Sequence, residues 1–241
     1  MSIERKLPKV LPWCLQECPL CHEQKYVVAR GIIKMGDSIA RFPDRGYSFC
    51  NCKNIWFTDW ENIDLRGRHE NESVEVLRSY VSDININHLN YINSGFYRIC
   101  NHIQNKGYMR NKTLLIGDTP KTKEEFSRLG FVTSSSIEGK SYDLIWAYHI
   151  LEHCHYPLET LQEWYNALDK DGELFIAMPD PYFIEFNDTA AWGHWLLREH
   201  YIMWDMGSFC DEAKRIGFKV VYKTRNTFVK VCKDMHIILQ K

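Results

Sequence analysis

Residues 142–181 read YDLIWAYHILEHCHYPLETLQEWYNALDKDGELFIAMPDP, and this stretch decides the fold. The apolar run 142–148 predicts a buried strand, and residues 157–168 carry apolar side chains at helical spacing. An Asp-Gly turn at 171–172 precedes a second apolar run, 173–178, which predicts another strand. Strand, helix and strand in this order build a parallel sheet, whose ligands lie beyond the carboxyl ends of the strands.

The flanking segments continue this alternation of strands and helices. Further strands are expected at 112–118, 131–134, 218–224 and 235–240, and helices at 121–129 and 198–216, the latter ended by Gly217. The short connection 225–234 suits an antiparallel hairpin between the last two strands. The pattern therefore predicts an α/β protein with a doubly wound, mostly parallel sheet.

Two close pairs of cysteines lie near the N-terminus. Cys18 and Cys21 have two residues between them, Cys50 and Cys52 have one, and two β-rich stretches, 25–33 and 38–49, separate the pairs. Four thiolates on two turns joined by a hairpin make a tetrahedral site that suits Zn²⁺ in a structural role. We predict a small zinc-ribbon-like β module. The tight second pair leaves Cys14 or His22 as an alternative ligand.

These elements divide the chain into three parts. We assign residues 1–60 to the cysteine-rich module, 61–108 to a helical linker and 109–241 to the α/β domain. The linker assignment comes from a charged stretch at 61–73, followed by apolar residues at mostly helical spacing as far as residue 104.

Composition excludes several classes of function. The 241 residues carry a net charge of −1, which gives no electrostatic footprint for nucleic acid. No apolar run approaches the roughly 20 residues needed to cross a bilayer, and the N-terminus lacks the apolar core of a secretory signal. We expect a cytoplasmic protein without a membrane or nucleic-acid partner, and its nine cysteines should be mostly reduced.

The α/β part resembles the class I S-adenosylmethionine-dependent methyltransferases, in their small-molecule branch. The resemblance rests on the strand and loop YDLIWAYHILEH at 142–153, the helix at 157–168, the Asp171-Gly172 turn, the strand ending in Met178-Pro179-Asp180, and Gly217-Phe218. It covers about residues 110–241. It implies a seven-strand-type sheet, which here should lack its third strand because only residues 137–141 separate the second strand from the next.

The resemblance also implies roles for particular side chains. S-adenosylmethionine would lie against the ends of the first strands, and His153 or His200 would remove a proton from the acceptor. The implied cofactor-binding residues are Gly117, Asp118, Ser135, Ser136, Tyr148 and His149. The implied substrate-binding residues are Asp180, His194, Arg198 and Glu199. Similar proteins with an N-terminal zinc module methylate sugars, so the expected substrate is a small molecule such as a sugar or nucleotide sugar.

The chain departs from this family at the cofactor loop. Thr119 and Lys121 occupy positions where the family has glycines that let the backbone approach the cofactor. Ser134, Ser135 and Ser136 replace the acid that binds the ribose. Two hypotheses therefore stay open at this point: a methyltransferase, and a catalytically inactive methyltransferase-like domain that serves as a binding or assembly module.

Overall fold

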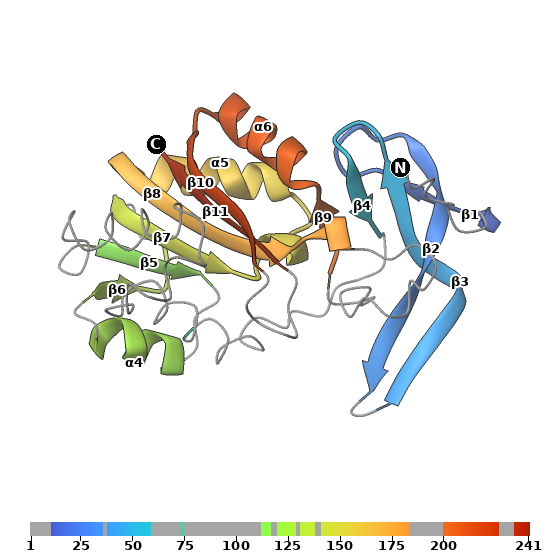
Figure 1. Cartoon of the computed structure of the whole chain (residues 1–241), viewed down its shortest axis with the longest axis horizontal. Helices are drawn as coiled ribbons and strands as arrows, with labels where there is room; N and C mark the ends of the chain where they lie inside the picture. Colours follow the sequence, from blue (N-terminus) through green and yellow to red (C-terminus); the bar gives the residue numbers. More distant parts are fainter. Residues whose placement is uncertain are drawn as a thin grey trace, which may run out of the picture.

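The chain forms two β-sheets, with helices on both faces of the larger one (Figure 1). The structure is a computed structural model that describes residues 11–35, 38–58, 74, 112–116, 120–128, 131–137, 141–183, 200–226 and 234–241. Side chains at 11–14, 29–45, 183 and 226 are outside this description. Within the described residues, no helix is long and apolar enough to cross a membrane.

The larger sheet has six strands in the order β10-β11-β8-β7-β5-β6. Its strands are β5 (Lys112–Ile116), β6 (Val132–Ser134), β7 (Tyr142–Tyr148), β8 (Leu168–Pro179), β10 (Lys219–Asn226) and β11 (Asp234–Gln240). Strands β6, β5, β7 and β8 are parallel to one another, whereas β11 is antiparallel to β8 and to β10. The predicted mixed, mostly parallel sheet with a C-terminal hairpin is confirmed. Among the described residues no strand pairs with the outer edge of β6, where the third strand was expected to be missing.

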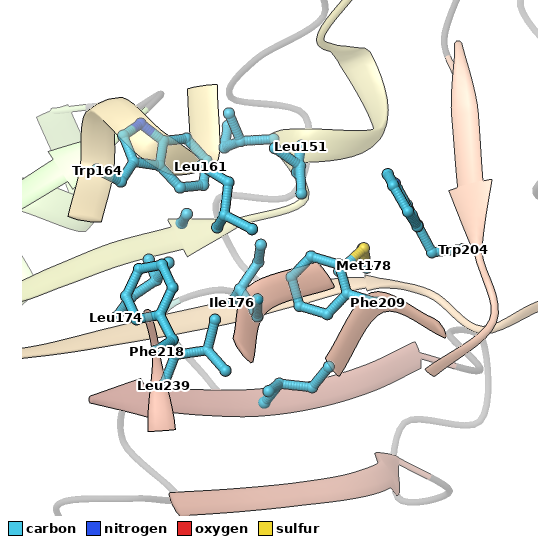
Figure 2. Packing of buried hydrophobic residues seen from close by; sticks show 14 of the residues in the cluster. Leu151, Leu161, Trp164, Leu174, Ile176, Met178, Trp204, Phe209, Phe218 and Leu239 are labelled. Carbon is cyan, nitrogen blue, oxygen red and sulfur yellow. The ribbon is translucent and has the colours of Figure 1, made fainter. Parts of the chain in front are cut away.

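Both faces of the central strands are buried under helices, and successive side chains on these strands point to opposite faces. On one face α5 (Pro157–Ala167) and α6 (Met206–Ile216) pack on the sheet, and α4 (Pro120–Arg128) lies on the other (Figure 1). Strand β7 shows the alternation: Ile145 joins the first core cluster, and Trp146 the second. In the second cluster Trp146 stacks on Phe175, with ring centroids 3.9 Å apart. Figure 2 shows the first cluster, in which Leu161 and Trp164 of α5 and Phe209 of α6 meet Leu174 and Ile176 of β8.

The smaller sheet is antiparallel and has the order β1-β2-β3-β4-β9. Its strands are β1 (Leu11–Glu17), β2 (Gln24–Met35), β3 (Ser38–Cys50), β4 (Ile55–Phe57) and β9 (Ile202–Trp204). The predicted N-terminal hairpin is thus confirmed as β2 and β3. The first four strands come from the N-terminal part of the chain, whereas β9 comes from the C-terminal half.

Strand β9 corrects the helix predicted at 198–216. Residues 202–204 are extended and pair with β4, and α6 begins only at Met206. Asp205 caps this helix, since its carboxylate accepts hydrogen bonds from the backbone N–H groups of Gly207 and Ser208 at 2.9 and 3.1 Å. The buried residues Ile202, Met203 and Trp204 could fit a helix or a strand by hydrophobicity alone. The end of the helix was predicted correctly: Gly217 has φ = 122°, a conformation that other residues rarely adopt.

Strand β9 also joins the two sheets into one packed structure. The backbone N–H of Thr58 donates to the carbonyl of Tyr201 at 3.0 Å, and Lys53 forms a 2.6 Å ion pair with Glu212 of α6. Trp204 of β9 is fully buried, in the same cluster as Ile55 and Phe57 of β4 and the core of the larger domain. The boundaries at residues 60 and 108 stay a prediction, because residues 61–108 apart from Val74 lie outside the described part.

Candidate active site and cysteine cluster

The four predicted metal ligands lie together at one end of the smaller sheet. Cys18 and Cys21 belong to the turn between β1 and β2, while Cys50 ends β3 and Cys52 lies in the turn that follows. All four sulfur atoms are within 4.8 Å of one another, with Sγ–Sγ distances of 3.7 Å for Cys18–Cys52 and 3.6 Å for Cys21–Cys50. Zinc–sulfur bonds of about 2.3 Å in a tetrahedron place the sulfur atoms about 3.8 Å apart. The cluster therefore fits a structural zinc ion.

Two of the four thiols, those of Cys18 and Cys52, are hard to ionise without a metal. Burial raises the pKa of Cys18 to about 11, and burial together with the neighbouring cysteines raises the pKa of Cys52 as well. At Cys21, by contrast, hydrogen bonds from Glu23 and the neighbouring cysteines outweigh burial and lower the pKa. Zinc binds thiolates, so metal uptake by these residues would release protons.

His22, the alternative ligand, points away from the cluster. Its side chain is 76% exposed, and its Nδ1 atom lies 2.8 Å from a carboxylate oxygen of Glu17. The side chain of Cys14 is outside the described residues.

We expect His22→Ala to leave zinc content unchanged, at one ion per cysteine cluster, when metal is measured by mass spectrometry after desalting. A variant that lost half or more of this zinc would instead place the imidazole among the ligands.

A second cluster of polar side chains lies at the carboxyl end of β7. His149 follows this strand with φ = 53°, a left-handed conformation that is uncommon for a residue with a side chain. Its backbone N–H donates to the carbonyl of Ala177 in β8 at 2.9 Å. Its imidazole lies between two carboxylates: Nδ1 is 2.9 Å from Glu152 and Nε2 is 3.0 Å from Asp234. All three side chains have no exposed surface.

Opposite charges in this cluster stabilise the ionised form of each partner. Burial disfavours a charged imidazole, but the carboxylates of Asp234 and Glu152 outweigh it and raise the pKa of His149 well above its ordinary value. Burial likewise disfavours the Glu152 carboxylate, and the neighbouring His149 lowers its pKa instead. Without a metal, the three side chains therefore form a buried carboxylate–imidazolium–carboxylate group.

The structure predicts a large loss of stability when one partner of this group is removed. Asp234→Asn keeps the shape of the side chain but removes its charge, and breaking a buried ion pair in this way costs about 3–5 kcal/mol. We expect a decrease of that size in the free energy of unfolding, measured by urea denaturation. Asp171→Asn is a matched control, since Asp171 is exposed and has φ = 65°, which asparagine tolerates. Equal stability of the two variants would show that the Asp234–His149 contact contributes little.

The two predicted catalytic histidines lie next to Glu152. His153 belongs to a single 3-10 turn, η2 (Leu151–His153), and His200 directly precedes the residues leading into β9. Their ring centroids are 5.2 Å apart, and Nε2 of His153 lies 3.9 Å from a Glu152 oxygen. Distant parts of the chain hold this geometry: the backbone N–H of Tyr201 donates to the Glu152 carbonyl at 2.6 Å. The Tyr47 hydroxyl, from β3, donates to the His200 carbonyl at 2.7 Å.

Asp180, a predicted substrate-binding residue, takes part in another ion pair. Its carboxylate is buried after β8, 2.7 Å from Nε of Arg225 at the end of β10. Burial raises the pKa of Asp180, although Tyr182 and Arg225 act in the opposite direction. Arg225 also lies over the ring of Tyr182, 4.3 Å from its centroid. Sequence reasoning missed Arg225, because a basic residue in a predicted connection gives no sign that it faces a buried carboxylate.

The predicted cofactor-binding residues separate into buried and exposed groups. Tyr148 is buried on the α4 side of the sheet, with its ring 4.7 Å from that of His149 and 6.4 Å from that of His236. Burial lowers the pKa of His236 to about 4, so this ring is neutral at pH 7. Ser135 and Ser136 are exposed just beyond β6. The remaining predicted site residues, Gly117, Asp118, His194, Arg198 and Glu199, lie outside the described part of the chain.

A surface hollow elsewhere on the molecule does not coincide with these side chains. It lies between α5 and α6, and its lining includes Leu158, Ile216 and Ser141. Ser141 precedes β7, so this hollow is near the amino end of that strand. Ligands of open α/β sheets bind at the carboxyl ends, where His149, Glu152 and His153 lie. We therefore take the polar cluster, and not the hollow, as the candidate active site.

One protein-family model matches most of the chain. This model is described as "Methyltransferase domain" and matches residues 44–223. This range includes β4, the strands of the larger sheet from β5 to β8, the first part of β10, and the histidine cluster. No curated protein matches the chain.

Several solved structures resemble it at low sequence identity. A methyltransferase dependent on S-adenosylmethionine from Archaeoglobus fulgidus is 16% identical over 58% of this chain and 91% of its own, with a TM-score of 0.44. The 1,6-didemethyltoxoflavin-N1-methyltransferase of Burkholderia thailandensis, with bound 1,6-didemethyltoxoflavin and S-adenosylhomocysteine, is 14% identical over 81% of this chain and 99% of its own, with a TM-score of 0.45. A candidate O-methyltransferase from Nostoc punctiforme is 16% identical over 58% of this chain, with a TM-score of 0.41; the chain spans only 54% of that protein.

Proposed function

This chain belongs to the methyltransferase-domain family, and we propose that it transfers a methyl group from S-adenosylmethionine to a hydroxyl group of a small polar acceptor, such as a sugar or nucleotide sugar. The observation that supports this proposal best is the position of His153 and His200 beside the Glu152 carboxylate, at the carboxyl end of β7. That edge of a parallel sheet is where ligands bind, and an imidazole is the side chain best suited to accept a proton near neutral pH.

The exposed hydroxyls at the end of β6 fit the cofactor in part. Ser135 and Ser136 follow the strand next to β5, where the resemblance implies the ribose, and their hydroxyl groups can bind ribose hydroxyls. The side chains of Tyr148 and His149 are buried, so any contact with the cofactor at these positions would come from their backbone. When bound, S-adenosylmethionine supplies a methyl group on a positively charged sulfur.

The chain's own residues would position the acceptor and take up its proton. As the new O–CH₃ bond forms and the S–CH₃ bond breaks, His153 accepts the hydroxyl proton and the sulfur becomes a neutral thioether. Glu152, 3.9 Å away, favours the positively charged imidazole that results. Since methyl transfer depends mainly on the alignment of donor and acceptor, we assign His200 a role in holding the acceptor beside His153.

The more specific part of the proposal is that the acceptor is a sugar. It draws support from the cysteine cluster, because the methyltransferases with such a module that this sequence resembles act on sugars. Tyr182 adds a further argument: it is 57% exposed and its ring lies against Arg225, and exposed aromatic rings suit the apolar face of a sugar.

One observation favours the alternative of a non-catalytic domain. Helix α4 begins at Pro120, so only residues 117–119 connect it to β5, and the exposed Lys121 lies in its first turn. Thr119 and Lys121 stand where the resemblance places glycines that allow close approach of the cofactor. In that case the domain would serve as a binding or assembly module.

Calorimetric titration distinguishes the two functions. We expect S-adenosylmethionine and S-adenosylhomocysteine to bind the full chain, with one site each. Absence of binding by both at millimolar concentration would reject the enzyme and favour the non-catalytic domain. Turnover with any hydroxyl acceptor, measured as release of S-adenosylhomocysteine, would reject the non-catalytic domain.

A further inference from the structure

We propose that His149, Glu152 and His200 bind a second divalent metal ion, of the zinc class, separate from the cysteine cluster. One potential ligand atom from each of these side chains lies within 4.8 Å of the others, and all three residues are buried. Two imidazoles and one carboxylate form a donor set typical of Zn²⁺ and related transition-metal ions, whereas Mg²⁺ and Ca²⁺ prefer oxygen ligands alone.

The distance between the first two ligands suits a shared ion. Nδ1 of His149 is 2.9 Å from the nearest Glu152 oxygen. Two ligands bound to one zinc ion by bonds of about 2.1 Å in a tetrahedron are about 3.4 Å apart. Binding of an ion would therefore require these two ligand atoms to separate by about half an ångström.

Asp234 provides the support that a metal-binding histidine requires. Its carboxylate lies 3.0 Å from Nε2 of His149, the ring nitrogen that would not bind the metal. A histidine ligand almost always donates its other N–H group to such a partner, which fixes the orientation of the ring and strengthens its binding. With a metal bound at Nδ1, Asp234 and His149 would form a carboxylate–histidine–metal arrangement.

A divalent ion would also balance the charge of these three side chains. The carboxylates of Glu152 and Asp234 lie on either side of the His149 ring and have no exposed surface. A divalent ion bound among them would offset the negative charge of both carboxylates. A buried charge is costly unless it is compensated, so the ion would stabilise the site.

The backbone places the third ligand independently of any metal. Tyr201 donates its N–H to the Glu152 carbonyl, which ties the loop of His200 to η2, and the Tyr47 hydroxyl holds the His200 carbonyl from the smaller sheet. Tyr47 of the smaller sheet therefore helps to position His200, the third proposed ligand.

Three protein ligands leave a fourth position open for a bound water or substrate. His153 lies beside this site, with its ring 5.2 Å from that of His200. The role of the ion rests on the proposed function: bound to the acceptor hydroxyl, it would lower the pKa of that group and so ease the loss of the proton to His153.

Metal analysis of the full chain tests the site. After dialysis against Zn²⁺ and desalting, we expect two zinc ions per chain in the unmodified protein and one in both Glu152→Gln and His200→Gln. His155→Gln is the matched control and should keep two, because His155 is exposed and lies only two residues after His153. One zinc in the unmodified protein, or two in both variants, would overturn the proposal.

Cobalt spectroscopy covers the case in which Glu152→Gln does not fold. Co²⁺ in the cysteine cluster gives intense sulfur-to-metal absorption in the near ultraviolet, whereas Co²⁺ bound by nitrogen and oxygen adds only weak visible bands. We expect those weak bands on addition of the second equivalent, and their loss in His200→Gln with the sulfur absorption retained.

Failure of this inference is distinguishable from failure of the proposed function. A chain with one zinc that binds S-adenosylhomocysteine refutes only the second metal, and a chain with two zinc ions that does not bind it refutes only the methyltransferase.

Discussion

Replacing Cys18 by serine is expected to remove the zinc ion from the cysteine cluster and to unfold the smaller sheet. Cys18 has no exposed surface, and its sulfur lies within reach of the other three. Structural zinc sites contribute about 10–16 kcal/mol of apparent binding free energy in zinc-finger peptides, as much as the whole stability of a typical domain. Loss of a contribution of that size is therefore expected to unfold the five-stranded sheet that carries the cluster.

The effect should extend beyond the cluster into the candidate active site. Strand β4 leaves the cysteine turn and pairs with β9, and Tyr47 of the same sheet holds the carbonyl of His200. We therefore expect Cys18→Ser to lose the zinc of the cysteine cluster, to unfold at a much lower temperature by circular dichroism, and to lose activity together with structure.

Cys154→Ala serves as the control for this experiment. Cys154 is half-buried and lies outside the cluster, so its replacement should leave metal content and melting temperature nearly unchanged. A chelator should reproduce the effect of Cys18→Ser in the unmodified protein. If the serine variant melted at the same temperature as the unmodified protein, the cysteines would have no structural role.

His153→Gln is expected to lower kcat by about 10²- to 10⁴-fold, the usual contribution of a general base. The change should fall on kcat and leave KM nearly the same, since glutamine can still hydrogen-bond the acceptor but cannot accept its proton. The side chain of His153 is only 9% exposed and lies beside the Glu152 carboxylate, so water would not easily take over its role.

His155→Gln is the matched control here as well. It changes the same kind of side chain two residues away, where the ring is exposed and packs 4.2 Å from that of Tyr201. Activity close to that of the unmodified chain is expected. If both variants, with unchanged melting temperatures, turned over at the normal rate, alignment of the substrates alone would account for catalysis and His153 would not be the base.

The elements predicted best were those whose pattern needs no knowledge of distant contacts. Strand β7 was predicted to the residue, and the helix at 157–168 differs from α5 by one position, because a continuous apolar run and a stripe at helical spacing are local properties. The stop at Gly217 and the cysteine turns were predicted for the same reason. Strands β1, β4 and β9 were missed because they acquire their conformation from pairing with one another or with β2 and β3, and β4 and β9 have only three residues each.

In the candidate site, too, some features were predicted from the sequence and others were not. His153 and His200 were both expected to act on the acceptor, and the structure places their rings side by side. His149 was expected beside the cofactor, whereas the structure surrounds its side chain with Glu152 and Asp234, the second of which carried no signal in the sequence. A lone aspartate at the start of a strand could face solvent or a buried imidazole, and only the neighbouring strands determine which.

From its order of residues alone, this chain can be recognised as an α/β methyltransferase domain with four cysteines placed to share one metal ion, since periodicity and close spacing along the chain determine both. The grouping of His149, Glu152, His200 and Asp234 is a different kind of property. It depends on β11 lying next to β8 and on β9 pairing with β4, contacts between segments more than 50 residues apart along the chain. Such contacts form because both segments bury apolar surface in the same core. The local sequence pattern of a segment predicts that one of its faces is buried, but not which distant segment that face will contact.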